Sequence, residues 1–187
     1  MYQELNQGNA RLAKLNIKGI YSNKHYIFGA LIYIYVRIYT RMNNFSLGKN
    51  IYSVDMMITY LKLYKHRREK ALVGDYLHAL EGKNWGDVES PISPIDVLKA
   101  PNNYSAEYSR ITRADLKYPI IIHKGNVVDG LHRLAKAKLE GKEHVQIYTF
   151  EANLMRKFLL NKEEDWAKVD QMPVHELMTL FCARFGL

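Results

Sequence analysis

Residues 119–150 constrain the fold more than any other part of the chain. Two short apolar runs flank a turn at residues 124–126, a junction containing Gly130 follows, and a further apolar run begins at Val145. This order predicts a strand, a turn, a second strand, a glycine loop, a helix and a third strand. The class expected is therefore a small α/β domain.

The helix expected at residues 131–140 has one apolar face. Its apolar residues recur at the spacing i, i+3, i+4 and i+8, and the next glycine is placed to end it. The four apolar residues and the glycine are Leu131, Leu134, Ala135, Leu139 and Gly141. The opposite face is polar, as expected for a helix that covers a sheet.

The start of this helix carries two cationic side chains, His132 and Arg133. Cations at a helix N-terminus oppose the macrodipole by about 0.3–1 kcal/mol each when charged. A bound anion would reverse that cost, because backbone N–H groups and Arg133 could both donate to its oxygens, and Gly130 permits close approach. A purely structural interpretation also fits: Asp129 caps the helix, Arg133 reaches solvent and His132 packs.

Charge is unevenly distributed along the chain. The net charge is +8, and residues 1–70 hold 12 Lys or Arg against 3 Asp or Glu. This asymmetry suggests attraction to a polyanion such as nucleic acid or an acidic membrane surface, although a solvated basic face is equally ordinary. The densest part, a candidate DNA-binding surface, comprises Lys62, Lys65, Arg67, Arg68 and Lys70.

The most hydrophobic run, residues 27–36, is too short to span a membrane, which takes about 20 apolar residues. It is expected to form a buried strand or a short core helix. The single cysteine, Cys182, excludes a disulfide within the chain and favours a reducing, intracellular (cytoplasmic) setting. Cys182 lies between two phenylalanines in an expected terminal helix and is interpreted as a small core residue.

Other segments carry clear local signals. Ser53 is placed to cap a helix that ends at the basic residues 65–68, Asp75 to cap a second helix, and Pro173 to open the last one. Residues 102–111 and 152–160 are expected to be helical. Two prolines make residues 90–98 an extended edge strand.

The residues Asp129-Gly-Leu-His-Arg-Leu-Ala-Lys-Ala137, between the two apolar runs and Gly141, resemble the ParB/sulfiredoxin superfamily over about residues 90–152. The resemblance implies a small mixed sheet with flanking helices whose Gly130–Arg133 turn binds nucleotide phosphates. The ParB-like members it resembles most come from large DNA viruses, so a viral origin is a hypothesis.

Three branches of the superfamily differ at this motif. Sulfiredoxins have a nucleophilic cysteine where this chain has Leu131, so that reductase chemistry is excluded. Partition proteins bind CTP and continue into domains for which residues 151–187 are too few. Free-serine kinases carry Asp-Gly-His-His-Arg, of which this chain keeps all but the first histidine.

By resemblance to the kinases, Gly130, Leu131, His132 and Arg133 would hold nucleotide phosphates. Asp129 would organise a small hydroxyl substrate or Mg²⁺ and act with His132 in catalysis. The kinases also use a catalytic glutamate, for which this chain offers Glu107 and, as a second candidate carboxylate, Asp96. His123 could line the same crevice or be a satisfied histidine on the surface.

The domains expected are a basic, mostly helical N-terminal extension at 1–88, a nucleotide-binding core at 89–152 and C-terminal helices at 153–187. P-loop and Rossmann signatures are absent. The leading hypothesis is a protein that binds ATP, ADP or CTP with Mg²⁺ and acts as a small-molecule kinase or nucleoside triphosphatase. The alternative is a non-enzymatic ParB-like DNA-binding module.

Overall fold

In the computed structural model of the chain, the described residues are 43–187 except 84, 88 and 164. The apolar run at residues 27–36 lies outside them, together with much of the basic N-terminal third. The described part is a mixed α/β structure with small sheets and flanking helices, which confirms the expected fold class.

The main sheet has four strands in the order β3-β8-β6-β7. β6 and β7 form an antiparallel hairpin, β8 runs parallel to β6, and β3 lies antiparallel to β8 at the edge. The strands are β3 (Glu69–Leu72), β6 (Ile120–His123), β7 (Asn126–Asp129) and β8 (His144–Thr149). In the β6–β7 turn, Lys124 and Gly125 have φ angles of 48° and 76°, the two positive values that a type I′ turn requires.

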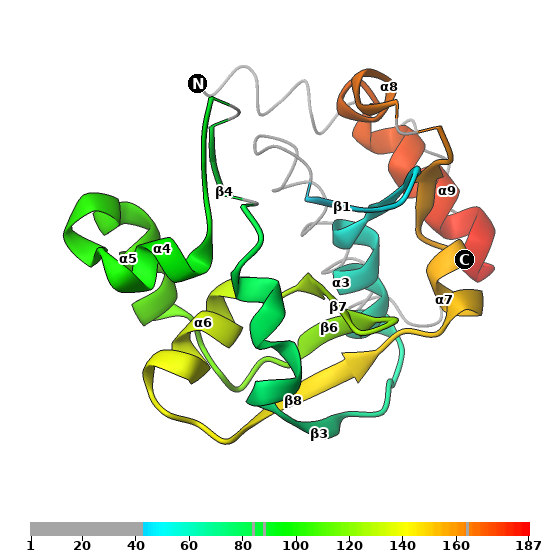
Figure 1. Ribbon diagram of the computed structural model, residues 1–187. Helices are drawn as coiled ribbons and strands as arrows, with labels where there is room; N and C mark the ends of the chain where they lie inside the picture. Colours follow the sequence, from blue (N-terminus) through cyan, green and yellow to red (C-terminus); the bar gives the residue numbers. More distant parts are fainter. Residues whose placement is uncertain (1–42, 84, 88, 164) are drawn as a thin grey trace, which may run out of the picture.

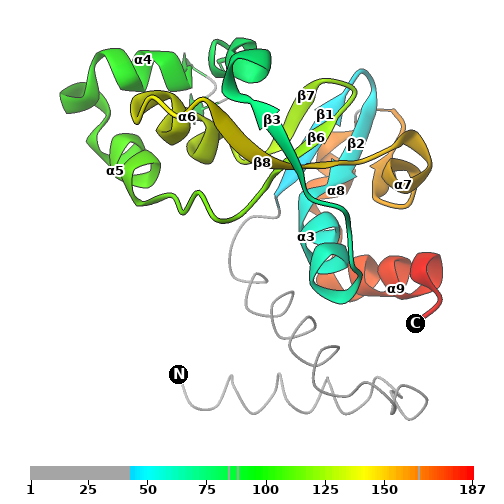
Figure 2. The same cartoon turned by 90° about the horizontal axis from the view of Figure 1, so that it is seen from below.

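The β6–β7 hairpin lies between two hydrophobic cores. In β6, Ile121 faces one core, whereas Ile120 and Ile122 face the other. The sequence of a strand that is buried on both faces is typically an uninterrupted apolar run, and residues 120–122 have this pattern. Figures 1 and 2 agree that α4, α5 and α6 lie on one side of these strands and that α3, α7, α8 and α9 lie on the other.

The first core lies under α6, which runs from β7 to β8 and buries Leu134, Ala135 and Ala137 completely. Gly141 follows its last turn with φ 64°, as expected, but Leu139 is 45% exposed and is not part of the apolar face. The elements around this core are η1 (Val73–Leu80), α4 (Pro94–Lys99), η2 (Pro101–Tyr104), α5 (Ser105–Arg113) and α6 (Leu131–Leu139).

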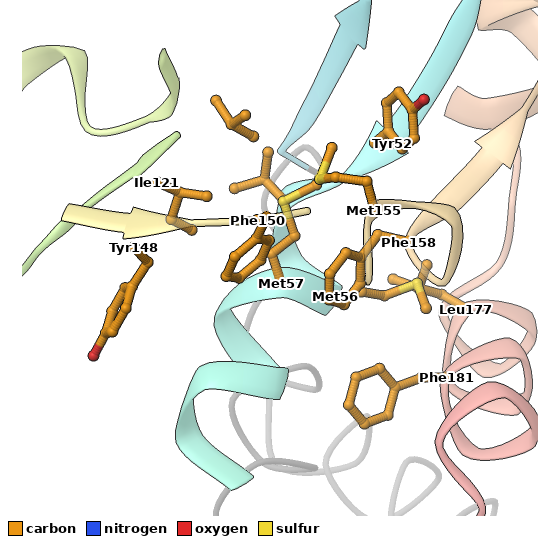
Figure 3. Close-up of a cluster of buried hydrophobic side chains, with 12 residues drawn as sticks. Tyr52, Met56, Met57, Ile121, Tyr148, Phe150, Met155, Phe158, Leu177 and Phe181 are labelled. Atoms are coloured by element: carbon orange, nitrogen blue, oxygen red, sulfur yellow. The ribbon is translucent and has the colours of Figure 1, made fainter. Parts of the chain in front are cut away.

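The second core is aromatic and rich in methionine (Figure 3). Phe150, at the end of β8, stacks on Phe158 with 5.5 Å between ring centroids, and Met56 and Met57 of α3 pack beside them. A three-stranded sheet in the order β1-β2-β9 and the helices α3, α7 and α9 contribute to it, and α8 lies on the same side of the main sheet. These elements are β1 (Asn44–Leu47), β2 (Asn50–Ser53), α3 (Val54–Leu63), α7 (Ala152–Arg156), β9 (Leu159–Asn161), α8 (Trp166–Asp170) and α9 (Val174–Phe185).

Two helix starts agree with the sequence and one does not. Ser53 accepts a hydrogen bond from the Met56 amide at the start of α3, and Pro173 precedes α9. Asp75 caps nothing, because it lies inside η1, whose first residue follows Leu72 without a side-chain cap.

Residues 90–98 are not one extended strand. Only β5 (Ser90–Ile92) is extended, and it pairs with β4 (Trp85–Asp87). Pro94 then begins α4, because proline suits the first turn of a helix, where its missing N–H is not needed. Ser93 and Asp96 form a capping box around that start, in which each side chain accepts from the other's backbone N–H.

The chain also departs from the expected elements at 1–88 and 152–160. In the described part of 1–88, β3 belongs to the main sheet through its pairing with β8, so residue 88 marks no structural boundary there. The second range is helical only as far as Arg156, after which β9 joins β2. Both departures come from strand pairing between distant segments, which local sequence patterns do not encode.

The capping box predicts a measurable stability loss. Ser93→Ala should lower the free energy of unfolding by about 1 kcal/mol, the usual cost of losing a side-chain cap. Urea denaturation followed by circular dichroism would measure it. Ser105→Ala is the matched control, because Ser105 is exposed at the start of α5 and does not cap that helix. Equal losses in the two variants would contradict the capping role.

Candidate functional site

A cavity of about 1350 Å³ lies at the start of α6. Its walls come from β1, η1, α5, β7, α6 and α8, that is, from elements of both cores. All five residues of the sequence motif line it: Asp129, Gly130, Leu131, His132 and Arg133. The fold therefore brings the predicted phosphate-binding turn to the wall of a cavity large enough for a nucleotide-sized ligand.

The α6 start has no side-chain cap. Gly130 is its N-cap residue, with φ 106° and ψ 21°, and its carbonyl accepts the first helical bond, from the Leu134 amide at 2.9 Å. The N–H groups of the first turn have no acceptor within the helix itself. Asp129 therefore does not cap the helix, in contrast to the structural interpretation of the motif.

Arg133 folds back over Gly130. One terminal nitrogen lies 2.6 Å from Oδ2 of Asp129, and Nε is buried without a hydrogen-bond partner among the described residues. A Cβ at position 130 would lie 2.8 Å from that nitrogen and 3.1 Å from Nε. Only glycine therefore allows both the positive φ and this position of the guanidinium group.

His132 is fixed on two sides. Its ring stacks on Trp85 of β4, with 4.3 Å between centroids and 16° between planes. Its Nε2 lies 3.1 Å from Oε2 of Glu107 in α5, and the other oxygen of Glu107 accepts from Arg110 at 2.9 Å. The structure therefore brings the predicted Glu107 to the motif, as a partner of His132.

The cavity carries more positive than negative side chains in its described lining. Arg110, Arg113 and Arg133 face two carboxylates, Asp129 and Asp170. Arg113 donates from Nε to a backbone carbonyl in its own helix and forms no ion pair with a carboxylate of the described residues. Arg110 and Arg113 are exposed and Arg110 is paired with Glu107, so the positive charge that is least screened by solvent is that of Arg133.

Asp96 does not line the cavity. Its carboxylate accepts from the backbone N–H and the hydroxyl of Ser93, and these hydrogen bonds lower the pKa of Asp96, the backbone one most. It therefore serves the start of α4, and nothing in its surroundings links it to the motif.

Two further residues lie outside the cavity: His123 is buried rather than on the surface as the sequence suggested, and Cys182 is only partly buried. His123 is buried and its Nδ1 donates to the Phe150 carbonyl at 2.6 Å, so it is a satisfied histidine between β6 and β8. Cys182 is half-buried in α9, and burial raises the pKa of its thiol, which disfavours the reactive thiolate.

The basic cluster lies at the end of α3 and along β3, outside the cavity. All five side chains, Lys62, Lys65, Arg67, Arg68 and Lys70, are exposed. Arg68 is held in place, since its Nε donates to the Tyr148 hydroxyl at 2.9 Å. Arg67 lies 3.8 Å from a carboxylate oxygen of Glu69.

Sequence reasoning missed Trp85, Arg110 and Arg113. Trp85 contacts His132 from a two-stranded hairpin that is distant in sequence, and no local sequence pattern predicts that contact. Arg110 and Arg113 could have been found from the sequence. Glu107, Arg110 and Arg113 are three residues apart, which places all three on one face of a helix. The two arginines also lie in the last turn of α5, where cations are favourable.

No group of three or more His, Cys, Asp or Glu side chains in the described ranges is arranged to hold a metal ion. No described helix has the length and hydropathy needed to cross a bilayer. No protein-family model matches the chain, and neither a curated protein nor a solved structure is significantly similar to it. The ParB/sulfiredoxin resemblance therefore rests on the motif residues.

Glycine at position 130 can be tested against a second glycine with positive φ. Gly130→Ala and Gly125→Ala both introduce a Cβ in the left-handed region, which costs about 1–2 kcal/mol. A Cβ on Gly125 meets nothing within 4 Å, whereas one on Gly130 meets Arg133. Gly130→Ala should therefore lower the free energy of unfolding further, as measured by urea denaturation.

The loss of unfolding free energy should be larger for Gly130→Ala than for Gly125→Ala only while Arg133 is present. In an Arg133→Ala background the two glycine variants should lose equal amounts, because the clashing group is then absent. If Gly130→Ala still lost more stability than Gly125→Ala in that background, the position of the guanidinium group would not be the reason for glycine at position 130.

Proposed function

We propose that this protein binds a nucleotide through its phosphates at the start of α6 and transfers or hydrolyses the terminal phosphate. The observation that carries the proposal is the uncapped α6 start inside a cavity, with the unpartnered Nε of Arg133 lying over Gly130. The resemblance of Asp129–Arg133 to the kinase motif supports the same assignment.

The chemistry of this helix start favours phosphate. A phosphate oxygen would accept from the free N–H groups of the first turn, where the helix dipole also favours negative charge. The guanidinium of Arg133 would add charge-assisted hydrogen bonds, and its Nε would gain the acceptor it lacks. The Asp129 carboxylate occupies one guanidinium nitrogen, so an arriving phosphate must compete with it.

Mg²⁺ fits this site as a companion of the nucleotide. It is usually bound through one or two carboxylates together with substrate phosphates. Asp129 supplies one carboxylate at the motif, and its Oδ1 has no protein partner among the described residues. Asp129 displaced from Arg133 by phosphate would then be available to the metal, which also neutralises charge during phosphoryl transfer.

The remaining walls suit a nucleoside better than an inorganic ion. Phe45 and Trp166 line the cavity, and aromatic faces stack on bases with about 1–3 kcal/mol each. Asn44 also lines it, and its Oδ1 is buried without a partner in the described part of the chain. A side-chain amide offers a donor and an acceptor side by side, which matches the edge of a base such as adenine.

Intrinsic fluorescence provides a direct test, because both tryptophans of the chain, Trp85 and Trp166, line the cavity. Titration with ATP, ADP, CTP or GTP, each with Mg²⁺, should change the emission in a saturable way. Arg133→Ala should weaken binding by roughly 10- to 100-fold, as expected for the loss of a charged hydrogen-bond donor of about 1.5–3 kcal/mol.

Arg156→Ala is the matched control for this titration, because Arg156 lies on α7 outside the cavity and bonds only to Asn153 among the described residues. Its affinity should equal that of the unmodified protein. A lack of response to all four nucleotides, or an equal response in Arg133→Ala, would refute the assignment.

A second candidate function, DNA binding without catalysis, is favoured by the exposed basic cluster of α3 and β3. Replacing Lys65, Arg67 and Lys70 together with alanine should weaken binding to duplex DNA and reduce its salt dependence by about one counterion per lost phosphate contact. Gel mobility at two salt concentrations would measure this. If the unmodified protein does not change the mobility of duplex DNA at low salt, this candidate function is refuted.

A further inference from the structure

His132 has one ring nitrogen engaged and one free. A carboxylate only accepts hydrogen bonds, so the contact of Nε2 with Oε2 of Glu107 requires a proton on Nε2. In the neutral ring, Nδ1 then carries the lone pair, and it has no hydrogen-bond partner among the described residues. The ring also stacks on Trp85, which favours this orientation. The result is an oriented imidazole with a defined nucleophilic atom.

The position of this ring suits attack on phosphorus. His132 lines the cavity and belongs to the first turn of α6, next to Arg133 and the N–H groups that would hold the phosphate. Positioning and charge neutralisation supply most of the catalysis in phosphoryl transfer. Histidine is among the side chains that form covalent intermediates, and a neighbouring group that orients it is the usual structural signature.

We infer that Nδ1 of His132 accepts the terminal phosphoryl group of the bound nucleotide, so that a phosphohistidine forms at the start of α6. The inference rests on the proposed nucleotide binding and adds a covalent step to it. In that step the Nδ1 lone pair forms the N–P bond. The bond between the γ-phosphorus and the β–γ bridging oxygen breaks, and its electron pair leaves with the nucleoside diphosphate.

Glu107 is the positioning residue of this step. The ring becomes positively charged as the N–P bond forms, and the Glu107 carboxylate at Nε2 stabilises that charge. Arg110 holds the other carboxylate oxygen and so keeps Glu107 in place. Attack of water on the phosphorus would later return the N–P electron pair to Nδ1 and release phosphate, with a proton passing to solvent.

The test uses the full chain with MgATP labelled on the γ-phosphate. Phosphohistidine is stable in base and labile in acid, so the label should survive an alkaline quench and be lost in acid. Mass spectrometry should place it on His132, and ³¹P NMR should assign it to Nδ1. His132→Gln should abolish the label.

His144→Gln is the matched control, because His144 also faces a carboxylate, that of Glu143 at 3.5 Å, but lies outside the cavity. This variant should keep full labelling. Glu107→Gln should slow labelling by roughly 100-fold with nucleotide binding retained, since loss of the carboxylate that sets a catalytic imidazole's tautomer is costly.

Tryptophan fluorescence measured in parallel distinguishes a failure of the phosphohistidine inference from a failure of the proposed nucleotide binding. Nucleotide that binds without labelling the protein, or label on a residue other than His132, overturns the phosphohistidine and leaves the proposed binding intact. Absence of nucleotide binding overturns the proposed function, and the phosphohistidine with it. A two-bond ¹⁵N–¹H spectrum showing the Nδ1–H tautomer of His132 in the unmodified protein would also contradict the inference.

Discussion

The ion pair between Arg133 and Asp129 holds the guanidinium group over the start of α6. A guanidinium group at the positive end of a helix is unfavourable by itself, and a nearby anion offsets that cost. In the structure that anion is the protein's own carboxylate, which satisfies one nitrogen of the guanidinium and leaves Nε without an acceptor. The carboxylate therefore leaves one donor of the guanidinium group without an acceptor among the described residues.

The location of this pair follows from the two-core architecture. Because β6 and β7 are buried between both cores, the end of β7 is held rigidly, and Asp129 and Gly130 follow directly from it. The same arrangement positions the cavity, since its walls come from helices of one core, from β1 of the other and from α8. A ligand there would contact both halves of the molecule and so stabilise their packing together.

The sequence predicted the features that depend on near neighbours. Lys124 and Gly125 form the expected turn, Gly141 ends α6, and Ser53 caps α3, because each is decided within a few residues. The pairing of β3 with β8 and the stack of Trp85 on His132 join distant segments, and no pattern within one segment specifies them. Asp96 differs for another reason: the two prolines suggest an extended strand at residues 90–98, whereas Pro94 begins α4 and Asp96 takes part in its capping box.

The two basic regions differ in the physics of anion binding. The α3–β3 cluster is exposed, so its attraction is spread over a surface and is screened beyond about 8 Å at physiological salt. At the cavity, the Arg133 side chain is more withdrawn, with 22% of it exposed, whereas Arg110 and Arg113 are exposed like the cluster. Interactions there depend on orientation and on hydrogen bonds as much as on charge, which favours a small phosphate ester over a polymer. Within the described residues, the cavity therefore combines a withdrawn positive charge with a defined geometry, whereas the side chains of the surface cluster are all exposed.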